Sequence, residues 1–334
     1  MVTANHLTGE DHDPAYRAIG RRGSDGAQLG FGLAAIGRPA YITLGRHADL
    51  PTNRSPAALE SRAHELLDEA TALGIRYVDA ARSYGLAEQF LGHWLRGRET
   101  PPFVASKWGY EYTAGWRSDA IHQEIKDHSL STFERQLAET TDLLGPWLRL
   151  YQVHSLTADS PLWQDPALQN RLAALRVTGV EVGFSTSGAA QGDAVRRGLE
   201  LTVDGVALFS SVQTTWNLLE PSAGDALAEA HAAGLRVVIK EALANGRLTD
   251  RNATGDSRLE QAARQHDVGV DAIALAAALA QPWCDVVLCG AVTVPQLQSN
   301  ATALTLVGAV DTANLVTPEP PQEYWAARSR LRWT

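Results

Sequence analysis

Short apolar runs alternate with helix-like segments along most of this chain, and this alternation limits the possible folds more than any other feature. Eight runs have the near-continuous apolar character of buried parallel strands. They lie at 31–36 (FGLAAI), 75–79, 102–106, 148–153, 180–184 (VEVGF), 206–212 (VALFSSV), 235–240 (LRVVIK) and 285–289 (DVVLC). Repeated strand–helix alternation implies a parallel sheet, and one closed sheet accommodates all eight runs. We therefore predict an α/β fold, a (β/α)8 TIM barrel in a single domain.

The segments between the runs carry helix signals. SPAALESRAHELLDEATALG opens with a serine cap signal and ends at Gly74, and LSTFERQLAETTDLLG ends similarly at Gly145. We place the barrel at 31–315. The polar, glycine-rich residues 1–30 are expected to form an arm or a small strand pair. Residues 316–334 begin with prolines and end in a basic, aromatic stretch, so we expect Tyr324, Trp325 and Trp333 to pack this tail on the barrel.

Composition and charge narrow the partners. A chain with 45% hydrophobic and 20% charged residues is typical of a globular domain, and its net charge of −9 argues against nucleic-acid or membrane surfaces. The two cysteines, Cys284 and Cys289, are interpreted as buried thiols in a reducing compartment, with no metal-ligand cluster around them. With no apolar leader or spanning run visible, we expect a cytoplasmic monomer or homodimer that acts on a small molecule.

Four polar residues stand at or just beyond the ends of successive apolar runs. Asp79 closes GIRYVD, Tyr84 lies five residues further on, Lys107 follows PFVAS, and His154 follows LRLYQV. Each alone has a simpler explanation: a helix cap, a surface phenol, a solvated amine or a core histidine. In a barrel, however, the carboxyl ends of the strands share one face, so all four should converge there. Such a set can give a proton to a carbonyl oxygen.

Seven motifs make the chain resemble the aldo-keto reductases, a family of NAD(P)H-dependent barrel enzymes. They are VDAARSYG (78–85), SKWG (106–109), YQVHS (151–155), GFSTSG (183–188), VQTTWNLLE (212–220), ALANGRLT (242–249) and CGAVTVPQLQSN (289–300). They occur in family order and at family-like separations. The resemblance implies reduction of an aldehyde, a ketone or a sugar-like carbonyl compound by NADP(H) or NAD(H), but it does not specify the substrate.

This resemblance suggests a role for each of the four polar residues. Tyr84 would be the general acid, and Lys107 would lower its pKa, which is near ~10 for an unperturbed phenol. Asp79 would keep Lys107 charged and oriented. His154 would donate a hydrogen bond to the carbonyl oxygen.

The resemblance also implies a nicotinamide site. Trp216 would stack on the nicotinamide ring, and its alternative interpretation is a core aromatic. Gln213 and Ser185 would bind the carboxamide. Thr186 stands where the family usually has Asn, which leaves more of this contact to Ser185.

The pyrophosphate and the adenosine would be held by the last two strand ends. Leu243, Asn245 and Gly246 belong to a loop whose backbone N–H groups can cradle phosphate oxygens. Lys240 before it would pair with a phosphate, with Glu241 or with Asp79, and these alternatives stay open. Further contacts are expected at Gly290, Thr293, Gln296 and Asn300.

The late segment departs from the NADPH-preferring pattern. The turn GAVTVPQLQSN has no basic residue to meet a 2′-phosphate, and Ser299 replaces a frequent Glu. NADPH preference is therefore in doubt and NADH use is open. Arg247 and Arg251 in the neighbouring loop are the candidates for replacing the missing charge.

The substrate pocket is expected to be lined by aromatic residues, which suits a partly apolar or ring-shaped compound. These residues are Tyr41, Trp108 and Tyr110, together with Trp116 and parts of the tail. Two other functions are considered. One is a lyase or aldolase that forms a Schiff base on Lys107 or Lys240. The other is a nucleotide-binding regulatory subunit with low turnover.

Overall fold

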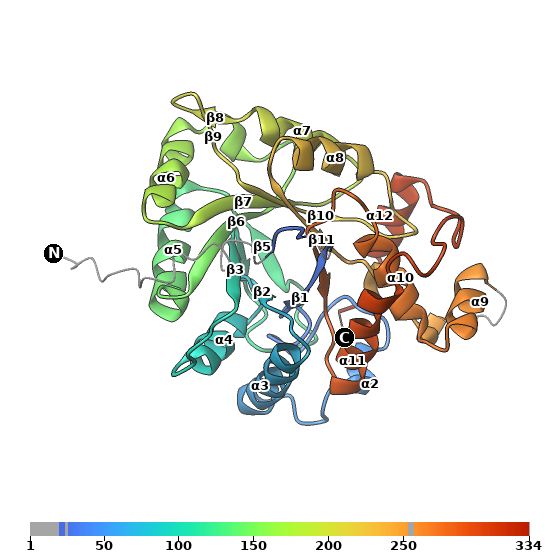
Figure 1. Cartoon of the computed structure of the whole chain (residues 1–334). Coiled ribbons are helices and arrows are strands. Elements are labelled where there is room, and N and C mark those ends of the chain that lie inside the picture. The colour runs from blue at the N-terminus through green and yellow to red at the C-terminus, as the bar shows by residue number, and fades with distance from the viewer. Residues whose placement is uncertain (1–19, 24–25, 253–256, 334) are drawn as a thin grey trace.

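The fold is a closed barrel of eight parallel strands, as predicted. The computed structural model describes residues 20–23, 26–252 and 257–333 (Figure 1). The barrel strands are β1 (Gln28–Gly32), β2 (Tyr77–Asp79), β3 (Phe103–Trp108), β6 (Leu148–Leu156), β7 (Glu181–Thr186), β10 (Ser211–Thr215), β11 (Arg236–Lys240) and β12 (Val286–Cys289). They follow the order β1-β12-β11-β10-β7-β6-β3-β2, and β2 pairs with β1 to close the barrel.

Helices follow the strands and surround the barrel (Figure 1). They are α2 (Arg46–Asp49), α3 (Pro56–Ala72), α4 (Ala87–Leu95), α5 (Leu130–Leu144), α6 (Pro166–Val177), α7 (Gln191–Glu200), α8 (Gly224–Ala232), α9 (Arg258–Gln265), α10 (Val270–Leu279), α11 (Val294–Leu306) and α12 (Pro321–Ser329). Short 3-10 turns are η2 (Pro161–Gln164), η3 (Ala244–Gly246) and η4 (Asp250–Asn252). Two antiparallel hairpins, β4 (Tyr110–Tyr112) with β5 (Glu124–Lys126) and β8 (Thr202–Val203) with β9 (Val206–Ala207), interrupt the alternation.

Local signals explain where the first long helix begins and ends. The hydroxyl of Ser55 accepts a hydrogen bond from the backbone N–H of Ala58, which caps α3 as the sequence predicts. Leu59 and Leu66 are fully buried on its inner face. Just past its end, Gly74 adopts a φ of 79°, a conformation that favours glycine.

Alternation along the strands positions the site. Successive side chains of a strand point to opposite faces. Tyr77 and Phe103 therefore share the barrel interior with Asp79 and Lys107, two and four residues further along their own strands. The two rings stack with centroids 5.3 Å apart, in a small buried cluster with Leu150. The interior thus changes from apolar to polar toward the carboxyl ends of the strands.

Two strand predictions were wrong in position. The first strand covers 28–32 rather than 31–36, because after Gly32 the apolar run bends into a turn closed by the N–H of Gly37 on the carbonyl of Leu33. The sixth barrel strand is β10 rather than 206–212. Asp204 and Gly205 both have positive φ, as an Asp-Gly hairpin turn requires, and they form the β8–β9 hairpin on the surface.

The chain ends differ in how far the structure describes them. Residues 1–19 of the predicted arm lie outside the described residues, and Gly23 and Gly26 form an isolated antiparallel bridge. In the tail, Tyr324 is buried.

Cys284 and Cys289 are free and buried, as expected. Within the described part of the chain, no helix is both long and apolar enough to cross a membrane.

Candidate active site

The four polar residues singled out in the sequence lie together at the carboxyl end of the barrel. Asp79 ends β2, Lys107 lies in β3, His154 lies near the end of β6, and Tyr84 lies in the turn before α4. The Nζ of Lys107 donates to the hydroxyl oxygen of Tyr84 over 3.3 Å. The rings of Tyr84 and His154 meet edge to face, with centroids 5.6 Å apart.

The carboxylate of Asp79 holds this group of side chains in place. It forms a buried ion pair with Lys107, whose Nζ also donates to the carbonyl of Ala80 over 3.1 Å. Its Oδ1 accepts hydrogen bonds from the amides of Gln213 at 2.9 Å and Gln152 at 3.4 Å. Burial lowers the pKa of Lys107, and the Asp79 carboxylate opposes this shift. Asp79 therefore fixes both the position and the charge of the ammonium.

Burial governs the proton on Tyr84. We expected Lys107 to lower the pKa of this phenol, but the pKa lies well above its usual value. Burial is the largest cause, and the nearby Asp79 carboxylate raises the pKa further, while Arg38 lowers it. Tyr84 therefore carries its proton, which is the form required of a proton donor.

The imidazole of His154 is neutral. Burial and the positive charges of Lys107, Lys240 and Arg38 hold its pKa well below the usual value. Its Nδ1 lies 3.5 Å from the hydroxyl of Ser83. A neutral imidazole facing Tyr84 keeps one N–H to offer to a carbonyl oxygen.

Arg38, which the sequence analysis did not single out, forms part of the cavity wall beside Tyr84. Its Nη1 donates to the carbonyl of Ser83 and to the carboxylate of Glu124, both at 2.8 Å. Its guanidinium carbon lies 5.3 Å from the ring centroid of Tyr84 and 4.6 Å from that of Trp333. In sequence this is one arginine of a loop, GRPAY, with no pattern that separates it from a solvated one.

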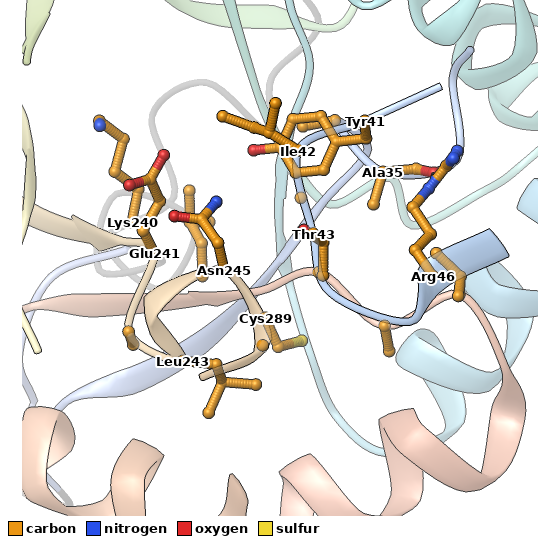
Figure 2. A pocket seen from close by; sticks show the side chains of 18 of the residues that line it. Ala35, Tyr41, Ile42, Thr43, Arg46, Lys240, Glu241, Leu243, Asn245 and Cys289 are labelled. Carbon is orange, nitrogen blue, oxygen red and sulfur yellow. Dashed lines mark hydrogen bonds between the residues drawn. The ribbon is translucent and has the colours of Figure 1, made fainter. Parts of the chain in front are cut away.

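The C-terminal tail forms another part of the wall. Arg328 of α12 forms an ion pair with Glu241, the residue after β11. Trp333 lies edge to face with Tyr41, with ring centroids 6.2 Å apart. Figure 2 shows Glu241 with Lys240 and Asn245 on one side of the pocket and Tyr41 on the other. Residues from both ends of the chain thus enclose the space above the barrel.

One cavity of about 630 Å³ extends from Tyr84 and His154 to the segments expected to hold a nucleotide. Ten of the predicted cofactor and substrate residues line it. They are Tyr41, Tyr110, Gln213, Lys240, Leu243, Asn245, Gly246, Gly290, Gln296 and Asn300. Lys240 donates to the hydroxyl of Thr215 over 2.7 Å, and burial lowers its pKa to about 8.

Three predicted aromatic residues are not among those that line this cavity. Trp216 lies one residue beyond β10, at odd spacing from the inward-pointing Gln213, and meets Trp283 edge to face with centroids 5.8 Å apart. Trp108 follows the inward Lys107 and is buried against Phe133, with ring centroids 4.9 Å apart. The third residue, Trp116, meets Phe90 edge to face with ring centroids 6.3 Å apart.

Three further predicted cofactor residues, Ser185, Thr186 and Thr293, are not among the lining residues. The hydroxyl of Ser185 accepts from the backbone N–H of Ser155 at 2.8 Å, and that of Thr186 donates to Thr214 at 3.1 Å. Thr293 caps α11 by accepting from the N–H of Gln296. Ser155 lines the cavity in place of Ser185.

The residues present fit a nicotinamide dinucleotide. Asn245 is 6% exposed, lines the cavity, and has a side-chain oxygen with no hydrogen-bond partner. Either end of such an amide can turn toward a polar ligand. Across residues 20–23, 26–252 and 257–333, no group of three or more His, Cys, Asp or Glu side chains could hold a metal ion.

The two arginines considered for the missing charge already have partners. Arg247 forms an ion pair with Glu319 of the tail. Arg251 forms one with Asp49, the last residue of α2, and also donates to the carbonyl of Gly45 at 2.9 Å.

Comparisons with known proteins show the family of this chain. The model of the aldo/keto reductase family matches residues 29–312, so the chain belongs to this family. It is similar in structure to the holo form of aldo-keto reductase AKR11C1 from Bacillus halodurans (21% identity, 90% of this chain and 91% of that one, TM-score 0.61). It is also similar to a predicted aldo-keto reductase from Pseudomonas aeruginosa (23%, 85% and 94%, TM-score 0.60). No curated protein matches the sequence.

Proposed function

We propose that this protein reduces an aldehyde or ketone to an alcohol with a reduced nicotinamide dinucleotide, NADPH or NADH, and that Tyr84 supplies the proton. The observation that carries the proposal is the hydrogen bond of 3.3 Å from the buried Lys107 to the hydroxyl of Tyr84, which lines the cavity, with Asp79 paired to the ammonium. Membership of the aldo/keto reductase family supports the same chemistry.

The roles follow from the contacts. The bound dinucleotide would supply the hydride. Tyr84 gives its proton to the carbonyl oxygen, and the Lys107 ammonium stabilises the phenolate left behind. Asp79 keeps that ammonium charged, and neutral His154 orients the oxygen by a hydrogen bond. Arg38, Trp333 and the tail restrict water around the reacting carbon.

The substrate class is proposed from the wall. Tyr41, Tyr110 and Trp333 present aromatic surface on the side of the cavity near Tyr84. This surface suits a partly apolar or ring-shaped carbonyl compound, sugar-like compounds included. A clear preference for small charged aldehydes would contradict this part of the proposal.

The decisive comparison is Tyr84→Phe against Tyr112→Phe, since Tyr112 lies in the β4–β5 hairpin and is not among the cavity residues. With a panel of aldehydes and ketones, we expect Tyr84→Phe to lower kcat by roughly 10²–10⁴-fold and to leave the Kd for the dinucleotide unchanged. Tyr112→Phe should keep its activity. Full activity of Tyr84→Phe would refute the role of the phenol.

The Schiff-base alternative keeps one specific observation in its favour, the pKa of about 8 at Lys240. Borohydride trapping of a carbonyl compound on Lys240, without any nicotinamide, would support it. The low-turnover regulatory role would instead show as tight dinucleotide binding with negligible reduction of every carbonyl compound tested.

A further inference from the structure

Three segments meet at the carboxylate of Asp49, on the wall of the cavity. Arg251 forms an ion pair with one carboxylate oxygen. Gln296, in the first turn of α11, donates from its side-chain amide to the other oxygen over 2.8 Å. Asp49, Arg251 and Gln296 all line the same cavity as Tyr84.

The amide of Gln296 has a defined orientation. Its oxygen accepts from the backbone N–H of Val292 at 3.0 Å, which leaves its N–H group for Asp49. Gln296 therefore holds the Asp49 carboxylate from the α11 side through an N–H of its amide. Hydride transfer would take place next to Tyr84 and His154. The adenosine half of an extended dinucleotide would then contact the α11 segment of the cavity.

Asp49 shares the cavity wall with basic and acidic side chains, Arg46 of the same helix among them. Asp250 and Asp271 line the cavity as well. Asp271 accepts from Ser299 at 3.0 Å and from Asn300 at 2.5 Å, and its pKa is raised mainly by burial. Arg251 is the cation in contact with Asp49, and it is already paired. A phosphate placed against Asp49 would meet a carboxylate whose contacting cation, Arg251, is already paired.

A second observation points to a ligand in this cavity. Asn245, in η3, is buried with an unpartnered side-chain oxygen. It lines the same cavity (Figure 2). A buried amide without a partner is costly unless a ligand satisfies it. Asp49, Asp250 and Asp271 line the same cavity, so their carboxylates would act on a dinucleotide bound there.

We propose that Asp49 makes this site select NADH over NADPH. The carboxylate accepts a hydrogen bond from the free 2′-hydroxyl of the adenosine ribose and repels the 2′-phosphate of NADPH. The inference rests on the proposed function, because it requires a nicotinamide dinucleotide in the cavity. The residue that distinguishes NADH from NADPH would then lie in the segment after β1, in addition to the turn that opens α11.

The test is the ratio of the two Kd values, followed by quenching of tryptophan fluorescence with NADH and NADPH. The wild-type protein should bind NADH roughly tenfold or more tightly than NADPH. Asp49→Asn removes the charge and should shrink this ratio at least about tenfold, chiefly by tightening NADPH binding. Asp49→Ser is a second variant with the same expected direction, should Asp49→Asn not fold.

Asp193→Asn is the matched control, since Asp193 is exposed on α7 and the ratio should not change. A wild-type preference for NADPH, or an unchanged ratio in folded Asp49→Asn and Asp49→Ser, would overturn the inference alone. Failure of the wild-type protein to bind either dinucleotide would overturn it together with the proposed function.

Discussion

Glu241 and Arg328 form a bidentate ion pair that ties helix α12 of the tail to the end of β11. The Nε of Arg328 lies 2.8 Å from one carboxylate oxygen, and Nη2 contacts the other. Burial alone would raise the pKa of Glu241, but Arg328 and then Lys240 lower it to about 2. This ion pair, between residues 87 positions apart in the sequence, thus holds the tail on the barrel and keeps the Glu241 carboxylate next to Lys240 charged.

Removing the arginine should loosen the tail. Arg328→Gln leaves the Glu241 carboxylate buried without its partner, so we expect a loss of about 3 kcal/mol in the free energy of unfolding and a KM for the carbonyl substrate raised roughly tenfold. Urea unfolding and steady-state kinetics measure the two effects. Arg330→Gln, at an exposed neighbour on the same tail, is the control and should change neither.

The same ion pair predicts a pH dependence. The pKa of Glu241 falls from 4.5 to about 2 on folding, so its stabilising effect is complete above pH 4.5 and is lost as the pH falls toward 2. The stability difference between the wild type and Arg328→Gln should therefore shrink over that interval. A difference that stays constant in acid unfolding curves would mean that the pair does not titrate as described.

Arg46 braces the loop that carries Arg38 and Tyr41. Its guanidinium donates to the carbonyls of Ala35 (2.6 Å), Arg38 (2.7 Å) and Pro39 (3.1 Å). Arg46→Met should cost about 3–5 kcal/mol of stability, because buried carbonyls lose their donors, and activity should fall as the loop shifts.

The control for this brace is Arg117→Met. Arg117 is an exposed arginine paired with Asp119, and its replacement should cost no more than about 1 kcal/mol. Equal melting temperatures for Arg46→Met and Arg117→Met would show that the hydrogen bonds of Arg46 do not stabilise this loop.

His154 should remain neutral throughout the physiological pH range. Its pKa lies well below 6.5, so kcat/KM should show no break near pH 6.5 from this residue. The unfolded chain binds the proton first, and the group therefore lowers stability as the pH falls below 6.5. NMR titration of the imidazole in the wild type, assigned by the spectrum of His154→Asn, checks the shift. A midpoint near 6.5 would rule it out.

Gly37 allows the loop after β1 to approach the turn of Tyr84. A Cβ added at Gly37 would lie 2.4 Å from the carbonyl oxygen of Tyr84 and 2.5 Å from the Cβ of Ala87. Gly37→Ala should displace the phenol, lower kcat and cost about 1–3 kcal/mol. Gly192→Ala in helix α7 has room for the methyl group, at 3.7 Å from Ala226, and should be neutral or slightly stabilising. Similar activity of both variants would refute the close approach.

Most of the framework could be predicted from local patterns. Six of the eight strands lie close to their expected positions, since apolar runs bounded by turns are a local signal. Asp204-Gly205 was a readable hairpin signal that the long apolar run 206–212 obscured. The convergence of Asp79, Lys107 and His154 followed from strand direction alone, because every parallel strand ends on the same face.

The details of the site needed the tertiary structure. The ring of Trp216 meets Trp283, a partner from a distant segment that the sequence does not reveal. Arg38 has no sequence signal, because its partners Glu124 and Trp333 come from distant segments. Side-chain direction at a strand end and long-range pairing depend on the register of neighbouring strands, which a single run does not contain.

The sequence alone determined the barrel, the order of its strands and helices, and the arrival of an acid, a phenol, an amine and an imidazole at one mouth. Tertiary structure decided the protonation of Tyr84, the partners of Arg38 and Arg251, and the closure of the site by Arg328 on Glu241. The physical reason is that hydrophobic periodicity is written locally, whereas desolvation and charge pairing depend on which distant groups folding brings within a few ångströms.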